Sequence, residues 1–153
     1  MQTIHRDEIQ ILEREMLPAE FAQMNAGFDA YALEHGNPSE IAERFGFVVM
    51  VDNVFAGVVS GLAQRVNDAY APWFYMSDLF IEKAYRGQGL GYALLSKMET
   101  KVKALGLHHI WLWTAGYEAP EFYKRQGYTV FCEMEQWYAS GHSRFGLRKK
   151  LLP

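Results

Sequence analysis

Hydrophobic residues in this chain recur at helical spacing in two long stretches. In the first, "PAEFAQMNAGFDAYALEHG", they recur every three or four positions, which is typical of an amphipathic helix. These positions are Phe21, Met24, Phe28, Tyr31 and His35. Pro18 suits the first turn of this helix and Gly36 its end. The second stretch, residues 91–105, repeats the pattern and is followed by Gly106, a favourable C-terminal cap.

Other stretches are rich in β-branched and aromatic residues and predict strands. Residues 45–64 indicate two strands joined at Asp52-Asn53, because these residues tolerate the positive φ of a tight hairpin. The remaining expected strands are 9–17, 73–82, 108–114, 128–138 and 143–151, the last two joined by a turn near Ser140-Gly141. The apolar run in 73–82 suggests burial on both faces. A short helix is expected at 119–127, and residues 37–40 have turn chemistry that also fits the start of a short helix. This order of elements predicts an α/β (α+β) fold, a mixed sheet with helices on its faces.

Composition narrows the class of protein. The chain has 153 residues, of which 50% are hydrophobic and 22% charged, so we expect one globular domain over residues 1–153. The formal net charge of −3 gives no general attraction to nucleic acid or anionic membranes. The single cysteine, Cys132, cannot form an internal disulfide, and the N-terminus lacks the apolar core of a signal peptide. A soluble, cytoplasmic protein is therefore expected.

The stretch "YRGQGLGY" at residues 85–92 lies between an expected strand and an expected helix. It fits either a plain glycine-rich turn or an anion site, because unpaired N–H groups and the helix dipole converge at a helix N-terminus. Arg86 would add charge-assisted hydrogen bonds to a phosphate. The dinucleotide spacing fails because Tyr92 stands where a third glycine is needed, and a P-loop fails because no Gly-Lys-Ser/Thr follows.

Arg86, Gly89 and Gly91 match R-x-x-G-x-G, which resembles the coenzyme A signature of the GNAT superfamily of N-acetyltransferases. The later stretch "APEFYKRQGY", residues 119–128, is similar to a second motif of that family. The two motifs together cover about residues 73–131. The resemblance implies a mixed, mostly antiparallel sheet of six to seven strands flanked by about four helices.

The resemblance also implies that acetyl-CoA is the co-substrate and that no metal is needed. The residues expected to bind coenzyme A are Leu79, Phe80, Ile81, Arg86, Gly87, Gln88, Gly89, Leu90, Gly91 and Tyr92. Tyr123 matches the family tyrosine that protonates the leaving thiolate, and Asp78 is a candidate general base or amine anchor. The sequence departs from the family pattern at Ser77, where relatives carry a first acidic residue, and at Gly116, where many carry Asn.

The acceptor is left open. The resemblance favours direct transfer of acetyl to the primary amine of a small molecule, and a protein or peptide amine is a second alternative. A non-catalytic coenzyme A-binding sensor or interaction module is a third alternative. His142 or Arg144 would lie near a substrate mouth, or in a solvated turn. Aromatic residues at 70–75 would line an acceptor site, or pack on a strand. No nucleic acid or membrane partner is expected, and a homodimer is expected by analogy alone.

Overall fold

The structure, a computed structural model, describes residues 8–151. The chain divides into an N-terminal unit that ends at Ser39 and a larger unit that begins at Glu40. The prediction of a single domain stays a prediction.

The N-terminal unit contains the first predicted helix, α1 (Pro18–Glu34), whose prediction is confirmed. Pro18 occupies the first turn, and the Glu20 carboxylate accepts a hydrogen bond from the Leu17 N–H at 2.8 Å. That contact uses an N–H group that would otherwise lack a partner at the helix start. Past the other end of the helix, Gly36 adopts a φ of 79°, which favours glycine. None of the α1 residues is buried.

The strand predicted at 9–17 is wrong, because these residues form no strand. Residues 37–40 form no helix, so the turn interpretation holds for them and the alternative of a helix start does not. An extended segment becomes a strand only by pairing with a neighbour, and the described residues give 9–17 none. Pro38 disfavours helical geometry at the residue before it, and strand β1 begins directly after this stretch.

The larger unit is built on one six-stranded sheet with the order β1-β2-β3-β4-β6-β5. Its strands are β1 (Ile41–Val51), β2 (Val54–Val66), β3 (Ala69–Ile81), β4 (His109–Ala115), β5 (Thr129–Met134) and β6 (Arg144–Lys150). Every neighbouring pair is antiparallel except β3 and β4, which are parallel. The prediction of a mixed, mostly antiparallel sheet is therefore confirmed.

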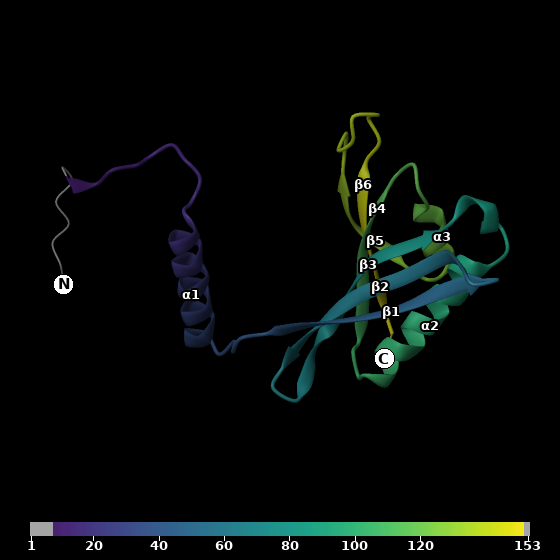
Figure 1. Ribbon diagram of the computed structural model, residues 1–153, viewed down its shortest axis with the longest axis horizontal. Coiled ribbons are helices and arrows are strands. Elements are labelled where there is room, and N and C mark those ends of the chain that lie inside the picture. Colours follow the sequence, from purple (N-terminus) through teal and green to yellow (C-terminus); the bar gives the residue numbers. More distant parts are fainter. Residues whose placement is uncertain (1–7, 152–153) are drawn as a thin grey trace. The chain divides into compact units, whose positions relative to one another are not determined.

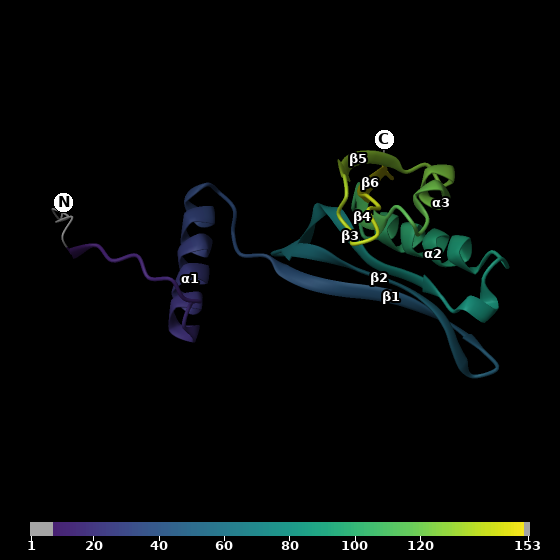
Figure 2. The same cartoon turned by 90° about the horizontal axis from the view of Figure 1, so that it is seen from above.

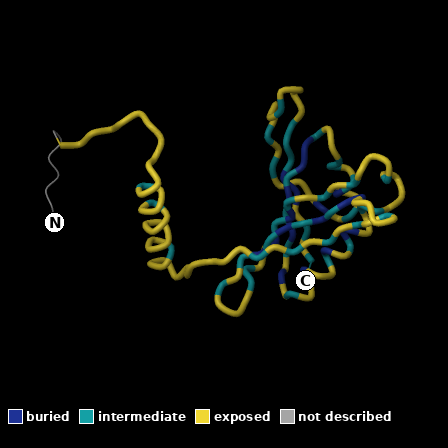
Figure 3. Tube along the Cα trace, viewed as in Figure 1, coloured by how far each residue is buried: buried dark blue, intermediate teal, exposed yellow. Residues whose placement is uncertain are grey.

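Two helices pack on this sheet, α2 (Leu90–Ala104) between β3 and β4, and α3 (Pro120–Arg125) between β4 and β5. Both connections join parallel strands and move in the same direction across the sheet, so right-handed crossovers put both helices on one face. Figures 1 and 2 show this arrangement, and buried residues of both helices share one core with the strands. Figure 3 shows the buried positions gathered along the central strands and α2. Within residues 8–151, no helix combines the length and hydrophobicity needed to cross a membrane.

Local geometry explains where several elements begin and end. Asp52 and Asn53 have φ values of 48° and 64°, so the predicted tight hairpin between β1 and β2 is confirmed. The strand predicted at 128–138 ends earlier, at Met134, and Gln136 has a φ of 52° that a strand does not allow. The prediction that 73–82 is buried on both faces is wrong, because Phe74 is fully buried while Trp73 is 38% exposed.

Candidate functional site

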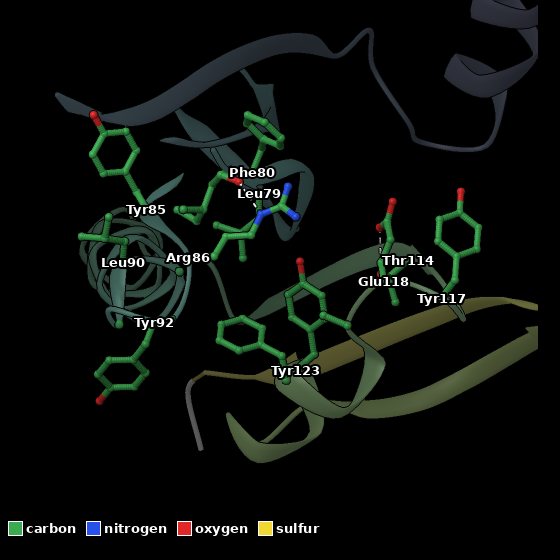
Figure 4. Close-up of a pocket in the computed structure, with 16 residues that line it drawn as sticks. Leu79, Phe80, Tyr85, Arg86, Leu90, Tyr92, Thr114, Tyr117, Glu118 and Tyr123 are labelled. Atoms are coloured by element: carbon green, nitrogen blue, oxygen red, sulfur yellow. Dashed lines mark hydrogen bonds between the residues drawn. The ribbon is translucent and has the colours of Figure 1, made fainter. Parts of the chain in front are cut away.

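The sheet opens between β3 and β4. Their parallel pairing spans only Trp73–Tyr75 and His109–Trp111, although β3 continues to Ile81 and β4 to Ala115. A cavity of about 830 Å³ lies where the two strands part. Its lining includes the end of β3, the glycine loop, the start of α2, the segment after β4 and α3 (Figure 4).

Most of the predicted donor-binding residues line this single cavity. These are Leu79, Phe80, Ile81, Arg86, Gly87, Gly89, Leu90, Gly91 and Tyr92. The predicted acid Tyr123 lines it as well. Asp78 and Gln88 are not among the lining residues. The prediction that these residues bind coenzyme A or act in catalysis stays a prediction, but the fold brings ten of the twelve together.

The loop before α2 has the backbone geometry that its glycines permit. Gly87 and Gly89 adopt φ values of 77° and 80°, which side-chain-bearing residues rarely adopt. A Cβ atom at either position would meet no atom within 4 Å, so the space above them is open. Gly91 differs, because its φ is ordinary and a Cβ there would make a normal contact with Phe122 at 3.6 Å. The backbone at position 91 therefore does not require glycine.

Gly89 is the N-cap of α2, so the first N–H groups of the helix have no partner within it. Arg86 lies beside them. Its Nε donates a hydrogen bond to the Ile81 carbonyl at 2.9 Å, which fixes the side chain over the end of β3. Figure 4 shows the remaining guanidinium nitrogens directed into the cavity. This end of the cavity therefore presents positive charge and backbone donors, a combination suited to phosphate.

Tyr123 comes from α3, and its hydroxyl points into the cavity between the loop and the segment after β4 (Figure 4). The residue is only 7% exposed. Burial raises the pKa of Tyr123 well above its usual value, and the negative charge of Glu118 adds to the rise. The hydroxyl therefore keeps its proton at neutral pH and is available as a donor.

Asp78 lies on the face of β3 that is opposite to the core. Phe74 and Met76 point into the core, and in a regular strand Asp78 would follow them. A β-bulge at Ser77 shifts the register, since Ser60 pairs with Asp78 while Gly61 pairs with Met76. Asp78 accepts a hydrogen bond from the Ser77 hydroxyl at 2.7 Å.

Arg44 lies 3.6 Å from the same Asp78 oxygen and donates to the Ser77 hydroxyl at 2.7 Å. The Asp78 carboxylate thus contacts Ser77 and Arg44, its side chain is 59% exposed, and it does not line the cavity.

Six cavity residues were not predicted as site residues from the sequence: Tyr85, Thr114, Tyr117, Glu118, Ala119 and Phe122. Ala119 and Phe122 belong to the second motif and Glu118 directly precedes it, so their position was the available signal. The Gly116 departure has a structural cause. The Gly116 N–H donates to the Ser143 carbonyl at 2.8 Å, and a Cβ atom at Gly116 would lie 3.2 Å from that oxygen. A side chain at this position would therefore press against the Ser143 carbonyl, which would have to move by a few tenths of an ångström.

His142, Arg144 and the aromatic residues at 70–75 do not line this cavity. His142 contacts the Ser140 hydroxyl at 2.8 Å through Nδ1, and the Arg144 guanidinium lies between the rings of Trp113 and Trp137. Of the aromatic residues at 70–75, Phe74 belongs to the core. Within residues 8–151, no group of three or more His, Cys, Asp or Glu side chains is arranged to hold a metal ion.

A comparison of the sequence with models of protein families identifies the class of protein that has this fold and cavity. Residues 9–128 match the model of the acetyltransferase (GNAT) family, and the chain belongs to this family. No curated protein sequence matches the chain.

Solved structures share the fold. An acetyltransferase from Bacillus cereus is similar with a TM-score of 0.77 and 24% identity, over 92% of this chain and 97% of that one. A protein from Agrobacterium tumefaciens is similar with a TM-score of 0.71 and 23% identity, over 93% of this chain and 98% of that one. An aminoglycoside 6'-N-acetyltransferase, solved with coenzyme A, has a TM-score of 0.60 and 17% identity, over 80% of this chain and 79% of that one.

Proposed function

We propose that this chain is an acetyl-CoA-dependent N-acetyltransferase that transfers acetyl directly to the primary amine of a small molecule. The observation that carries the proposal is the single cavity shared by the glycine loop and the Tyr123 hydroxyl. The loop suits the phosphates of the donor, and the tyrosine suits its leaving group. Membership of the acetyltransferase family supports the same reaction.

The cavity residues fit coenzyme A. A volume of about 830 Å³ falls in the range of pockets for ligands of this kind. The open space above Gly87 and Gly89 lets a pyrophosphate approach the backbone N–H groups, and Arg86 adds a cation. The β3 segment Leu79–Ile81 has parted from β4, so an extended arm of the donor has room to lie along it.

The bound donor supplies a thioester, whose carbonyl carbon accepts the amine nitrogen. The N–C bond forms as the C–S bond breaks, so the nitrogen loses its proton and the sulfur leaves as a thiolate. Tyr123 is placed to give its proton to that thiolate and to recover one from solvent. The raised pKa of Tyr123 keeps this proton in place until the sulfur needs it.

The test is an acetyl-CoA turnover assay against panels of small amines, peptides and proteins, with release of free thiol as the readout. The proposal expects thiol release that depends on a small amine and forms an equal amount of its amide. Release that depends only on peptides or proteins would move the acceptor to a protein. Binding of acetyl-CoA without thiol release for any acceptor would favour the sensor instead. A cytoplasmic location and a homodimer stay predictions.

A further inference from the structure

The cavity carries opposite charges at its two sides. Of the residues that line it, Arg86 and Glu118 are the charged ones. Arg86 belongs to the glycine loop, whereas Glu118 belongs to the segment after β4 (Figure 4). The positive side also has the N-terminus of α2, and it suits the anionic donor. The negative side is left for the other reactant.

Glu118 is held in place from the buried end of β4. The Thr114 hydroxyl donates to Oε2 of Glu118 at 3.3 Å, and Thr114 is only 5% exposed. Thr114 is the last but one residue of β4, so the carboxylate of the exposed residue Glu118 has one anchor in the sheet. The contribution of Glu118 to the raised pKa of Tyr123 places its charge within electrostatic reach of the tyrosine hydroxyl.

Tyr117 forms an aromatic wall beside this carboxylate. Its ring is 56% exposed and packs edge-on against Tyr138 and His142, with centroid distances of 5.2 and 5.4 Å. The backbone bond from Gly116 to Ser143 ties the same two segments together. A carboxylate next to an aromatic ring favours an alkylammonium group over a neutral or anionic one.

We infer that Glu118 binds the acceptor as an ammonium ion and takes its first proton, so the substrates are alkylamines that are cationic in water. This inference rests on the proposed function. The ammonium gives one proton to Glu118, and the free amine attacks the thioester carbon. The nitrogen loses its second proton to solvent as the C–S bond breaks. Tyr123 protonates the thiolate and recovers a proton from solvent, and Glu118 returns its proton to solvent, so one proton is released in each turnover. Glu118 thus takes the duty predicted for Asp78, whose carboxylate contacts Ser77 and Arg44 and does not line the cavity.

The experiment compares two isomeric amines, benzylamine and p-toluidine, on the full chain with acetyl-CoA. Benzylamine is a cation at neutral pH, whereas p-toluidine is already a free amine and needs neither anchor nor base. Glu118→Gln should lower kcat/KM for benzylamine about 100-fold and change that for p-toluidine less than about 3-fold. Glu118→Asp should recover part of the loss. The Kd for coenzyme A, measured by calorimetry, should stay within about 2-fold in both variants.

Glu121→Gln is the matched control, since it removes an exposed carboxylate outside the cavity lining and should leave both amines unaffected. Equal losses for the two isomers in Glu118→Gln would overturn the ammonium site while leaving N-acetyl transfer intact. Loss of benzylamine turnover in Asp78→Asn, with Glu118→Gln unaffected, would do the same. If the unaltered chain acetylates neither isomer nor any amine of the panel, the proposed function itself fails.

Discussion

The Nε of Arg86 donates to the carbonyl oxygen of Ile81 at 2.9 Å, so the glycine loop is tied to the last residue of β3. One side chain therefore joins two parts of the donor side of the cavity. It holds the strand end with one nitrogen and leaves its other nitrogens for an anion (Figure 4). A lysine supplies charge but not this forked geometry.

Arg86→Ala should weaken coenzyme A binding about 10-fold or more, because a hydrogen bond to a charged group is lost. Arg86→Lys should recover only part of that affinity, since Lys cannot hold the Ile81 carbonyl and a phosphate with the same fork. The measurement is a calorimetric Kd. Lys83→Ala is the matched control, because Lys83 is an exposed cation nearby that does not line the cavity. Equal weakening by both substitutions would show that general charge, and not the Arg86 geometry, attracts the donor.

Tyr123→Phe should lower kcat about 100-fold or more and leave the Kd for coenzyme A nearly unchanged, since only the proton donor is removed. Because burial raises the pKa of Tyr123, the phenol stays protonated through neutral and mildly alkaline pH. Its ionisation should therefore not limit kcat over that range, and any loss of rate there belongs to another group. Steady-state thiol release against pH provides the measurement. A kcat in Tyr123→Phe equal to that of the unaltered chain would remove this residue from the mechanism.

The sequence predicted the sheet unit well because its signals are local. Alternating or continuous β-branched residues predict strands, and Asp52-Asn53 predicts the tight turn between two of them. The stretch 9–17 has similar composition, but strand formation also needs a partner, which no local pattern specifies. The strand that ends at Met134 was predicted too long for a different reason. Gln136 has a positive φ that interrupts the strand, and its residue type does not predict that φ.

The donor side of the site was predictable because its residues lie within one short stretch around the glycines. The acceptor side was not, because it depends on two strands that part in space. Thr114 and Glu118 reach the cavity only once β4 has separated from β3. Asp78 was a reasonable candidate from its position before Leu79. The bulge at Ser77 turns the Asp78 side chain to the face that carries Arg44, and no residue pattern in the sequence predicts that bulge.

A hydrogen-bond network around Glu99 joins α2 to β6, and we expect it to affect the stability of the fold and not the reaction. Glu99 of α2 accepts hydrogen bonds from Lys149 at 3.0 and 3.2 Å and from the Tyr128 hydroxyl at 3.1 Å. Its side chain is only 15% exposed. Glu99→Ala should lower the free energy of unfolding by about 1–3 kcal/mol, because it leaves two donors unpaired.

Urea unfolding measures this effect. Glu121→Ala is the control, since it removes an exposed partner of Lys124, and it should cost less than about 0.5 kcal/mol. A loss for Glu99→Ala no greater than the control's would mean that solvent already satisfies these groups.

The two glycines of the R-x-x-G-x-G motif should differ sharply in what they tolerate. Gly89→Ala places a side chain at a φ of 80°, which should lower the free energy of unfolding by about 1–2 kcal/mol. It should also weaken coenzyme A binding, because the loop must shift to relieve the strain. Gly91→Ala has an ordinary φ inside α2 and a normal contact with Phe122, so it should be neutral or stabilising by up to about 1 kcal/mol. Thermal unfolding and a calorimetric Kd for coenzyme A, measured on both variants, separate the two cases. If Gly91→Ala weakens coenzyme A binding as much as Gly89→Ala without loss of stability, the donor approaches α2 so closely at Gly91 that a methyl group there interferes with it.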